Sequence, residues 1–549
     1  MKKINIYIPI VLALMSMVFS SCDDFLDKLP DNRAELDTED KIKKLMVSAY
    51  PDADPIIFLE MMSDNVDDYG PTNPNSDRFV EQIFAWEDVT EDDNNSPYRY
   101  WIYSYSGIVA ANTALEAIEE MGGANTDVLR QTKGEALLLR AYSHFMLVNI
   151  FCLNYNKETS STDLGIPYLD HVEQQLNLHH ERGTVAEVYE KIEKDIEEGL
   201  PLVGDSYDVP KYHMNSKAAY AFAARFYLYY EKWDKAVECA TKCLGASPAS
   251  QLRDWQYMST MTSNFEAYGN HFIDASLKCN LLLCTSVSQS PLAFGPYYIY
   301  KRFAHGTYLA TNEDMLATNI WGNSGQFWTA PKQYSATNLD LVCMWKLPYL
   351  FEFTDPVAQI GYRRTVYPLF TTDETLLNRA EAYIMLKQYD KAAADLTTWM
   401  KNITRSTKNL NPESIQEFYN GVKYAYSDEN HLASSLKKHL NPAFEIDAEG
   451  SVQECMLQCV LGFRRIETIQ QGLRWFDIKR YGIEIPRRQM DDAGHPAILL
   501  DWLSKDDLRR AVQIPMRVRQ GGLDPNPRGV DTETSSGNVV QIPNTYLVK

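Results

Sequence analysis

This chain of 549 residues has only one long apolar run, and that run lies near its N-terminus. Lys2 and Lys3 precede an apolar stretch from Ile6 to Phe19, which is too short and one-sided to be a spanning helix and is typical of a secretion signal. No later run approaches the roughly 18 apolar residues that a membrane crossing needs. The sequence therefore excludes a protein with several membrane helices.

Catalytic signatures are also missing. The chain has no HExxH, no GxSxG, no glycine-rich phosphate loop and no EF-hand spacing. Neighbouring carboxylates such as Asp67 and Asp68 are expected by chance among 74 acidic residues, so they indicate no glycosidase pair. We predict a protein that is not an enzyme and has no cofactor, with a calcium ion in the acidic loops as the alternative.

Basic residues are too few for a nucleic-acid binder, because 53 Lys and Arg face 74 Asp and Glu for a net charge of −21. The imbalance concentrates in residues 23–100, which hold 21 acidic and 7 basic residues. Two interpretations stay open: a solvated acidic face, or a surface used against a partner protein.

The nine cysteines form no CxxC motif. Cys239 and Cys243 share i,i+4 spacing with the pair Cys455 and Cys459, so each pair lies on one helix face. Neither pair has the two further ligands that a metal would need. We expect them to be buried as small hydrophobic side chains.

Cys22 closes the export signal within the sequence Phe19-Ser-Ser-Cys22, which resembles a bacterial lipobox. We predict a signal peptide at 1–21, a lipidated, palmitate-bearing flexible linker at 22–37, and a single body at 38–549. Plain secretion with cleavage near Ser20 or Ser21 is the alternative. About fifteen linker residues extend up to about 50 Å, so the body can stand off the lipid surface.

A helical repeat is the strongest internal pattern. Six residues follow the spacing 3, 6, 3, 4 and 8 of the tetratricopeptide repeat: Ala224, Tyr227, Trp233, Ala236, Ala240 and Pro248. A second unit repeats the first four intervals with Ala380, Tyr383, Tyr389, Ala392 and Leu396. Small residues let two antiparallel helices approach closely. We predict an all-α dominated fold, a tetratricopeptide-like helix-hairpin scaffold with repeat units at about 135–248 and 374–403.

Two long stretches interrupt this scaffold, at about 60–100 and 250–372, and a C-terminal segment covers 463–549. Residues 293–353 contain 14 aromatic residues in 61 and lack helical periodicity. Irregular, aromatic insertions on a rigid frame are typical of binding surfaces, where rings stack on sugars and amides bind hydroxyls. We predict ligand binding by Trp86, Asp88, Asn94, Asn95, Tyr297, Tyr298, Trp321 and Trp328. Trp101, Trp233, Trp399 and Trp475 are predicted to be core residues.

Several segments resemble the SusD/RagB lipoproteins of Bacteroidetes when taken in order. They are Cys22-Asp-Asp-Phe-Leu-Asp27, Glu135-Ala-Leu-Leu-Leu-Arg-Ala-Tyr142, Gly165-Ile-Pro-Tyr168, Glu381-Ala-Tyr383, and Gly472-Leu-Arg-Trp-Phe-Asp-Ile-Lys-Arg-Tyr-Gly482. Gln471 stands where the family usually has Glu, and the usual C-terminal ending is missing. The last segment is predicted to be structural, with Arg474, Asp477 and Arg480 pairing their charges within one turn.

The resemblance implies an outward-facing, lipid-anchored protein of the outer membrane. It implies that the protein binds glycan nutrients at the cell surface and delivers them to a SusC-like TonB-dependent transporter. Two alternatives stay open: a peptide-binding, RagB-like lipoprotein of the same architecture, and a tetratricopeptide-like scaffold that binds only a partner protein.

Overall fold

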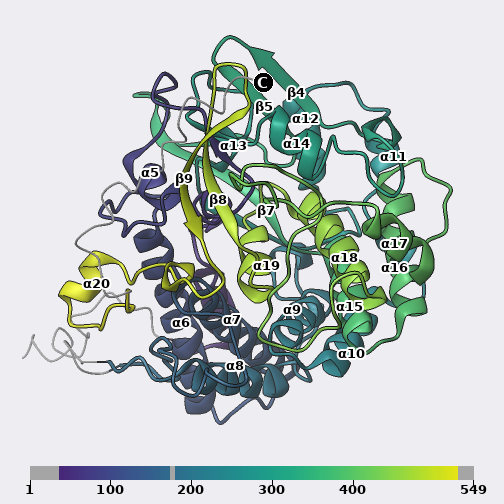
Figure 1. The fold of residues 1–549 in the computed structure, drawn as a ribbon. Coiled ribbons are helices and arrows are strands. Elements are labelled where there is room, and N and C mark those ends of the chain that lie inside the picture. Colours follow the sequence, from purple (N-terminus) through teal and green to yellow (C-terminus); the bar gives the residue numbers. More distant parts are fainter. Residues whose placement is uncertain (1–35, 174–179, 529–549) are drawn as a thin grey trace, which may run out of the picture.

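Helices, many of them packed in antiparallel pairs, form the main scaffold of the molecule, and three small sheets lie beside them (Figure 1). This computed structural model describes residues 36–173 and 180–528. The predicted signal peptide, Cys22 and nearly all of the predicted linker lie outside the described residues.

The helices before the aromatic insertion are α3 (Glu39–Leu45), η1 (Met46–Ala49), α4 (Ile56–Met62), α5 (Arg78–Phe84), α6 (Pro97–Glu120), α7 (Asp127–Phe151), α8 (Val185–Gly199), η2 (Pro210–Tyr212), α9 (Ser216–Tyr229), α10 (Trp233–Leu244) and η3 (Pro248–Gln251). Those within it are α11 (Trp255–Met258), α12 (Phe265–Phe272), α13 (Ser290–Phe294), α14 (Thr307–Glu313) and η4 (Ser324–Gln326). Those after it are α15 (Thr372–Met385), α16 (Tyr389–Ile403), α17 (Pro412–Asn420), α18 (Val452–Thr468), α19 (Arg474–Arg480), η5 (Leu508–Arg510) and α20 (Met516–Gln520).

The two predicted repeat units are the hairpins α9–α10 and α15–α16, and α10 packs directly on α15. Ala224, Ala236 and Ala240 are completely or almost completely buried where the helices of the first unit cross, and Ala380 and Ala392 repeat this in the second. Because these positions carry only a methyl group, the helix axes can approach closely. Thus the predicted helix-hairpin scaffold is confirmed.

Local signals fix where the scaffold helices begin. Thr184 and Glu187 form a reciprocal capping box at the start of α8, in which each side chain accepts a hydrogen bond from the other residue's backbone N–H. Thr126 and Thr371 cap α7 and α15 in the simpler way, through one hydroxyl each. The capping side chains satisfy backbone donors that have no partner inside the helix.

The strands form three sheets. β1 (Asp67–Asp68), β3 (Phe303–Ala304), β8 (Ile485–Met490) and β9 (Pro496–Leu503) form a four-stranded sheet in the order β3-β1-β8-β9. β2 (Asn280–Val287), β7 (Ile360–Thr371) and β6 (Leu350–Asp355) form a second sheet in the order β2-β7-β6, and β4 (Lys332–Ala336) pairs with β5 (Leu339–Cys343). The aromatic insertion is therefore partly β-structure, which its sequence did not reveal.

The predicted charge pairing within α19 is wrong in its main partners. Arg464 of α18 binds Asp477 with two hydrogen bonds of 2.8 and 2.9 Å, whereas Arg480 lies 3.4 Å from the same carboxylate. Arg474 instead binds Asp64, 2.9 Å away. The helix is nevertheless structural, as predicted, since its side chains are all buried.

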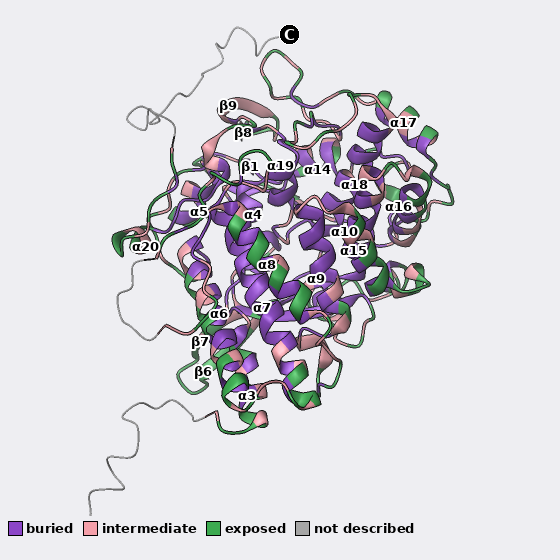
Figure 2. Ribbon diagram, turned by 90° about the horizontal axis from the view of Figure 1, so that it is seen from below, coloured by how far each residue is buried: buried purple, intermediate pink, exposed green. Residues whose placement is uncertain are grey.

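Burial follows the helices (Figure 2), where the buried residues concentrate on α7, α9, α15 and α18. The eight cysteines after Cys22 are all buried and free, which confirms the interpretation of their spacing. Trp399 and Trp475 are fully buried core residues, as predicted, and Trp101 is nearly so. Within the described ranges, no helix combines the length and apolar character of a membrane span.

Glu467 gives the stability of this core a predictable pH dependence. Burial and the nearby Asp373 raise its pKa from 4.5 to about 7, although Lys346 lies close by. Between these two pH values the folded chain holds a proton that the unfolded chain releases. The contribution of Glu467 to the free energy of unfolding therefore falls as the pH rises through this window, and it is constant above about pH 7.

We expect Glu467→Gln to remove this part of the pH dependence, because Gln keeps an oxygen for the indole N–H of Trp399, 2.9 Å from the Glu467 carboxylate. Urea unfolding at about pH 5 and about pH 7.5 measures the effect. Wild type should lose more stability between the two than the variant does. Glu417→Gln, at an exposed position, is the control and should behave as wild type. Equal losses in Glu467→Gln and wild type would contradict the assignment.

Candidate functional site

A hollow of about 860 Å³ is a groove between four separate segments. They are the segment Tyr69–Asn73 after β1, helix α14, the β4–β5 hairpin, and the turn Asp491–His495 between β8 and β9. In Figure 1 α14, β4 and β5 lie together at the top of the molecule. We call this hollow the polar groove. Three of its segments belong to the insertions and the turn belongs to the C-terminal segment, so the helix hairpins contribute none of them.

One wall of the polar groove is held by the carboxylate of Asp340. It accepts hydrogen bonds from the hydroxyl of Tyr69 at 2.7 Å and from the backbone N–H and hydroxyl of Thr307 at 3.0 and 2.6 Å. A Cβ on Gly306 would lie 1.6 Å from the Tyr69 hydroxyl oxygen, so only glycine allows this approach. Burial and Asp340 raise the pKa of Tyr69, so this phenol stays a neutral donor. The wall is thus preorganised.

Inside the groove, an aromatic ring lies beside free hydrogen-bonding groups. Tyr308 is half-buried, and the guanidinium of Arg488 lies 5.4 Å from its ring centre. Asn312 donates from its amide to the backbone carbonyl of Tyr308 at 2.8 Å, which fixes both residues on α14. In the described part of the chain, several hydroxyl and amide side chains lining the groove have no hydrogen-bond partner, among them Thr72, Thr311, Ser335, Thr337 and Asn338.

The charges lining the groove are acidic. Asp340, Asp491 and Asp492 contribute carboxylates, and Lys301 is the lysine that reaches its lining. The Lys301 ammonium is already bound elsewhere, because it donates to the carbonyls of Leu292, Ala293 and Gly295 at 2.9, 2.7 and 2.6 Å. An anionic ligand would therefore meet carboxylates without a free cation among the lining residues. The groove suits an uncharged, hydroxylated ligand.

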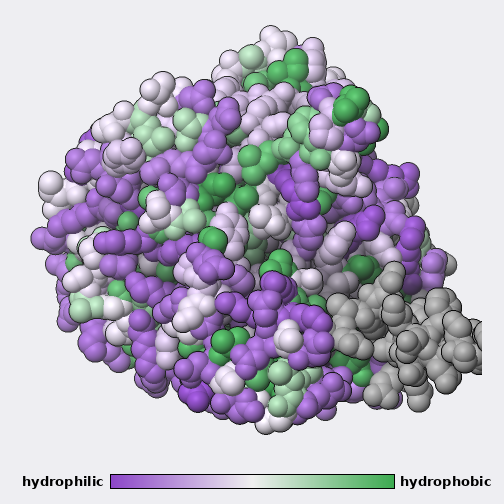
Figure 3. All heavy atoms as spheres, turned by 180° about the vertical axis from the view of Figure 1, so that it is seen from behind, coloured by the Kyte–Doolittle hydropathy of each residue, from purple (hydrophilic) through white to green (hydrophobic). Residues whose placement is uncertain are grey.

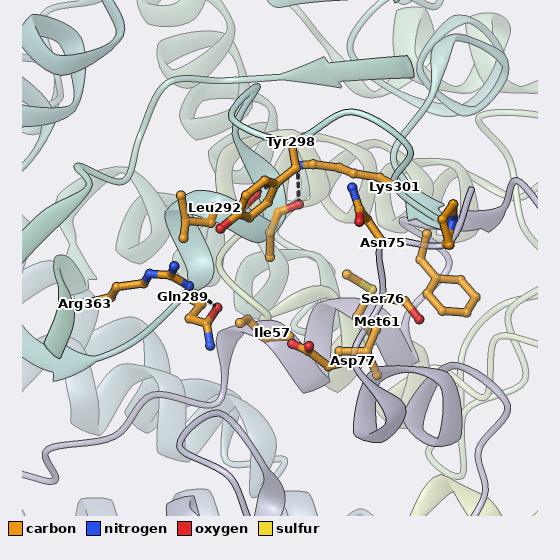
Figure 4. Close-up of a pocket in the computed structure, with 14 residues that line it drawn as sticks. Ile57, Met61, Asn75, Ser76, Asp77, Gln289, Leu292, Tyr298, Lys301 and Arg363 are labelled. Carbon is orange, nitrogen blue, oxygen red and sulfur yellow. Dashed lines mark hydrogen bonds between the residues drawn. The ribbon is translucent and has the colours of Figure 1, made fainter. Parts of the chain in front are cut away.

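Lys301 also borders a second hollow of about 340 Å³ (Figure 4), which we call the tyrosine pocket. Tyr298 lies on one side of it, Arg363 and Gln289 lie together on another, and Asn75 lies across from them. Burial lowers the pKa of Lys301 to about 8. Its three carbonyl acceptors cluster at the C-terminal end of α13, where the helix dipole favours a cation. Lys301 thereby holds the loop that carries Tyr298.

The eight residues predicted from the sequence do not converge on one site. Tyr298 lines the tyrosine pocket. Tyr297 is also exposed, but its ring packs edge-on against Phe265 at 4.8 Å. Asn95 is buried, and its amide oxygen accepts the backbone N–H of Gln289 at 3.0 Å, so it supports that pocket from behind.

The prediction that Trp86 and Trp321 present exposed rings is wrong, because each side chain is only 3% exposed. Trp86 follows α5 and donates from its indole N–H to the carbonyl of Met62 at 3.1 Å, with the Arg487 guanidinium 3.9 Å from its ring. Trp321 packs against Phe463 of α18, with ring centres 5.2 Å apart. Trp321 fills the space between its insertion and α18, and Trp86 lies between its own insertion and the C-terminal segment.

The remaining three predicted residues lie away from both hollows. Asp88 pairs with Arg528 at 3.2 Å, beside the C-terminal segment, and Asn94 is exposed. Trp328 is half-buried beside a different hollow of about 490 Å³, with Arg405 5.2 Å from its ring. These positions do not support a shared ligand site with Tyr298.

Sequence reasoning missed the residues that line the polar groove. The aromatic stretch 293–353 of the insertion contains Tyr308, Asn312 and Asn338. The predicted ligand-binding residues in this stretch were instead two tryptophans and two other tyrosines. A Gly before Thr307 and Tyr308 was the available signal, since glycine often marks a close approach of backbone and side chain. The turn at His495 carries a similar signal, since Gly494 precedes it and has a positive φ of 78°.

Comparisons with known proteins agree with this architecture. Residues 24–228 match the SusD-like family model described as "Starch-binding associating with outer membrane". A solved SusD superfamily protein from Bacteroides thetaiotaomicron is 18% identical, with a TM-score of 0.61 over 89% of this chain and 100% of its own. A SusD-like carbohydrate binding protein from Bacteroides vulgatus is 16% identical, with a TM-score of 0.58 over 88% and 96%. The N-terminal part of the chain is thus similar to the SusD-like family, and the chain shares the fold of the solved SusD-like proteins.

The resemblance seen in the sequence is thereby confirmed. A laminarin binding SusD-like protein has a TM-score of 0.50 at 16% identity, over 88% of this chain and 97% of its own. At these identities the solved SusD-like structures establish the fold. A search of curated proteins found no match.

We expect Lys301→Met to loosen the loop that carries Tyr298 without unfolding the body of the chain. The variant lacks the ammonium group that donates hydrogen bonds to three backbone carbonyls of this loop. Backbone hydrogen exchange in residues 292–302 should become faster, by the equivalent of about 1–3 kcal/mol in local opening. Lys278→Met, at an exposed position nearby in the sequence, should leave the exchange unchanged. Undiminished protection in Lys301→Met would show that the loop is held by other contacts.

Proposed function

We propose that this SusD-like chain binds neutral glycans at the cell surface, non-covalently and without a cofactor or catalytic turnover. The polar groove carries this proposal, because it combines a tyrosine ring, free hydroxyl and amide groups, and no unoccupied cation among its lining residues. Sugars need a ring face for their C–H groups and neutral donors and acceptors for their hydroxyls.

The dimensions of the groove support an oligosaccharide rather than a single sugar. A volume of about 860 Å³ lies at the upper end of ligand sites, and the segments around it leave it open to solvent. An open site buries only part of its ligand, so we expect modest affinity. The family model describes starch binding, and one structural neighbour binds laminarin, which makes neutral glucans the first ligands to examine.

The proposal includes location and delivery. Lipidation of Cys22 would hold the chain on the outer face of the outer membrane, and the family model describes association with that membrane. The chain would pass its glycan to a SusC-like TonB-dependent transporter, with the acidic N-terminal part as one docking face. A peptide ligand for the same groove, or a partner protein alone, would be revealed by probing the purified chain with a peptide array beside a glycan array.

Tyr308→Ala should weaken the binding of laminarin by about tenfold, because the variant loses the ring that faces the sugar while the carboxylate wall stays intact. Calorimetry with laminarin and starch oligosaccharides measures the change, and EDTA should not alter it. Tyr257→Ala is the matched control, since Tyr257 is an exposed tyrosine outside the groove.

Polygalacturonate, an anionic glycan, serves as the second arm of the same experiment. We expect it to bind wild type more weakly than neutral glucans, because of the groove carboxylates. The proposed site is refuted by laminarin binding that is undiminished in Tyr308→Ala. Tighter binding of the polyanion would refute the neutral ligand class.

Cys22→Ala should abolish incorporation of a palmitate analogue and remove the protein from the outer surface of the cell. Metabolic labelling and protease treatment of intact cells measure the two effects. Cys152→Ala is the control. Because Cys152 is buried in the body, this variant should still incorporate the palmitate analogue and remain on the outer surface of the cell. Labelling that persists in Cys22→Ala, or a wild-type protein protected from surface protease, would contradict the proposed anchor.

A further inference from the structure

The β6–β7 hairpin stands free of the sheet from which it grows. β2 pairs with β7 only as far as Arg364, whereas β6 pairs with the outer residues of β7 from Arg364 to Ile360. Beyond Arg364 the hairpin is therefore two-stranded, with no third strand beside it among the described residues. Exposed apolar surface on such an element needs an explanation, because monomers rarely present it.

Apolar side chains are exposed on both faces of this free hairpin. Phe351 and Phe353 lie on one face with ring centres 4.8 Å apart, and Ile360 and Tyr362 lie on the other, beside the ion pair of Glu352 with Arg364. Val357 at the tip is 95% exposed, Ile360 is 61% exposed and Phe353 is 46% exposed. A protein surface would cover one face of a hairpin, whereas an apolar medium surrounds both. The double-sided pattern favours immersion over docking.

The tip of the hairpin is a closed, preformed turn. One carboxylate oxygen of Asp355 accepts the backbone N–H groups of Val357 and Ala358 at 2.9 and 3.0 Å, which fixes the turn that projects Val357. Tyr349 and Tyr362 lie nearer the base and are also exposed. Tyrosines behind an apolar tip are typical of segments at a membrane interface, where the hydroxyl stays in water.

The hairpin lies near the N-terminal end of the described chain. At its base Arg364 pairs with Asp52 at 2.7 Å, shortly after η1. Figure 2 shows β6, β7 and α3 together at the lower edge of the molecule. Residues 22–35 are fourteen residues, which extend at most about 50 Å from a lipid on Cys22. A lipid surface is therefore within reach of this side of the body.

Figure 3 shows the back of the molecule, where apolar residues form several patches, some of them at the upper right, among mostly hydrophilic residues. At the opposite edge of Figure 2 lie β8 and β9, whose connecting turn lines the polar groove. A lipid surface at the hairpin would leave the groove facing away from the membrane. The two surfaces can therefore act at the same time.

We propose that the β6–β7 hairpin inserts its tip into the lipid surface beside the anchor. The anchor itself rests on the proposed function. Insertion is shallow, because the Asp355 carboxylate lies two residues from Val357 and stays at the depth of the lipid headgroups. Val357, Phe353 and Ile360 enter the outermost acyl region and contribute their transfer from water. The hairpin is a second attachment that orients a body which the tether alone would leave free to rotate.

Vesicle sedimentation tests the proposal with residues 23–549, which contain every described residue and lack Cys22. We expect this chain to bind vesicles of equal parts phosphatidylethanolamine and phosphatidylglycerol, and also neutral phosphatidylcholine vesicles, because the contact is apolar. The combined variant Phe353→Ser, Val357→Ser and Ile360→Ser should bind about tenfold more weakly. Leu164→Ser, Val209→Ser and Tyr257→Ser together form the matched control, since these exposed apolar residues lie outside the hairpin.

A bimane label on Val357→Cys provides a second measurement that does not depend on the triple variant. The cysteines of the described ranges are all buried, so the label attaches at the tip. We expect its emission to shift to the blue on vesicles and to become shielded from iodide, whereas a label on Ser250→Cys should show neither effect. The proposal would be overturned if wild type bound neither type of vesicle, or if the triple variant bound vesicles as tightly as wild type.

Sedimentation equilibrium without lipid tests the alternative that the hairpin binds a second copy of this chain. A dimer that the triple variant abolishes, together with an unshifted label on vesicles, would overturn the proposal in favour of self-association. No glycan or lipidated cysteine is present in these assays. A negative result would therefore leave the glycan and anchor experiments intact.

Discussion

Buried charges of opposite sign hold together parts of the chain that are far apart in sequence. Arg465 of α18 binds Glu313 at the end of α14 at 2.8 Å, and Lys438 binds the same carboxylate at 2.7 Å. Burial alone would raise the pKa of Glu313, yet Lys438 and Arg465 lower it to about 2. A buried charge without its partner costs several kcal/mol, so none of these segments can detach alone.

This charged cluster connects the helical scaffold to the polar groove. Arg474 of α19 binds Asp64, three residues before β1, and Arg488 of β8 binds Asp67 within β1 at 3.0 Å. From β1 the chain continues directly into Tyr69, which forms the groove wall with Asp340. The wall therefore takes its position from helices that contribute no side chain to the groove. Such support from behind is how a scaffold can stay constant while its insertions differ.

The scaffold could be predicted from the sequence because its signal is periodic and local. Each repeat unit needs alanines where its two helices cross, because the helices approach closely there. The groove has no such signal, because Tyr308, Asn338 and His495 come from three segments that pairing and buried charges bring together. Trp86 illustrates the opposite error. Its polar neighbours indicated exposure, yet arginines far away in sequence cover its ring.

The eight buried cysteines have a consequence for how the folded chain tolerates oxidants. Burial raises the pKa of their thiols, to about 12 for Cys239, Cys243, Cys284 and Cys343. Reactive thiolate is therefore scarce once the body has folded. The folded body thus protects its thiols by burial, without a disulfide in its described part. Oxidation of these thiols is therefore a hazard mainly for the unfolded chain, in which they are exposed and their pKa is not raised by burial.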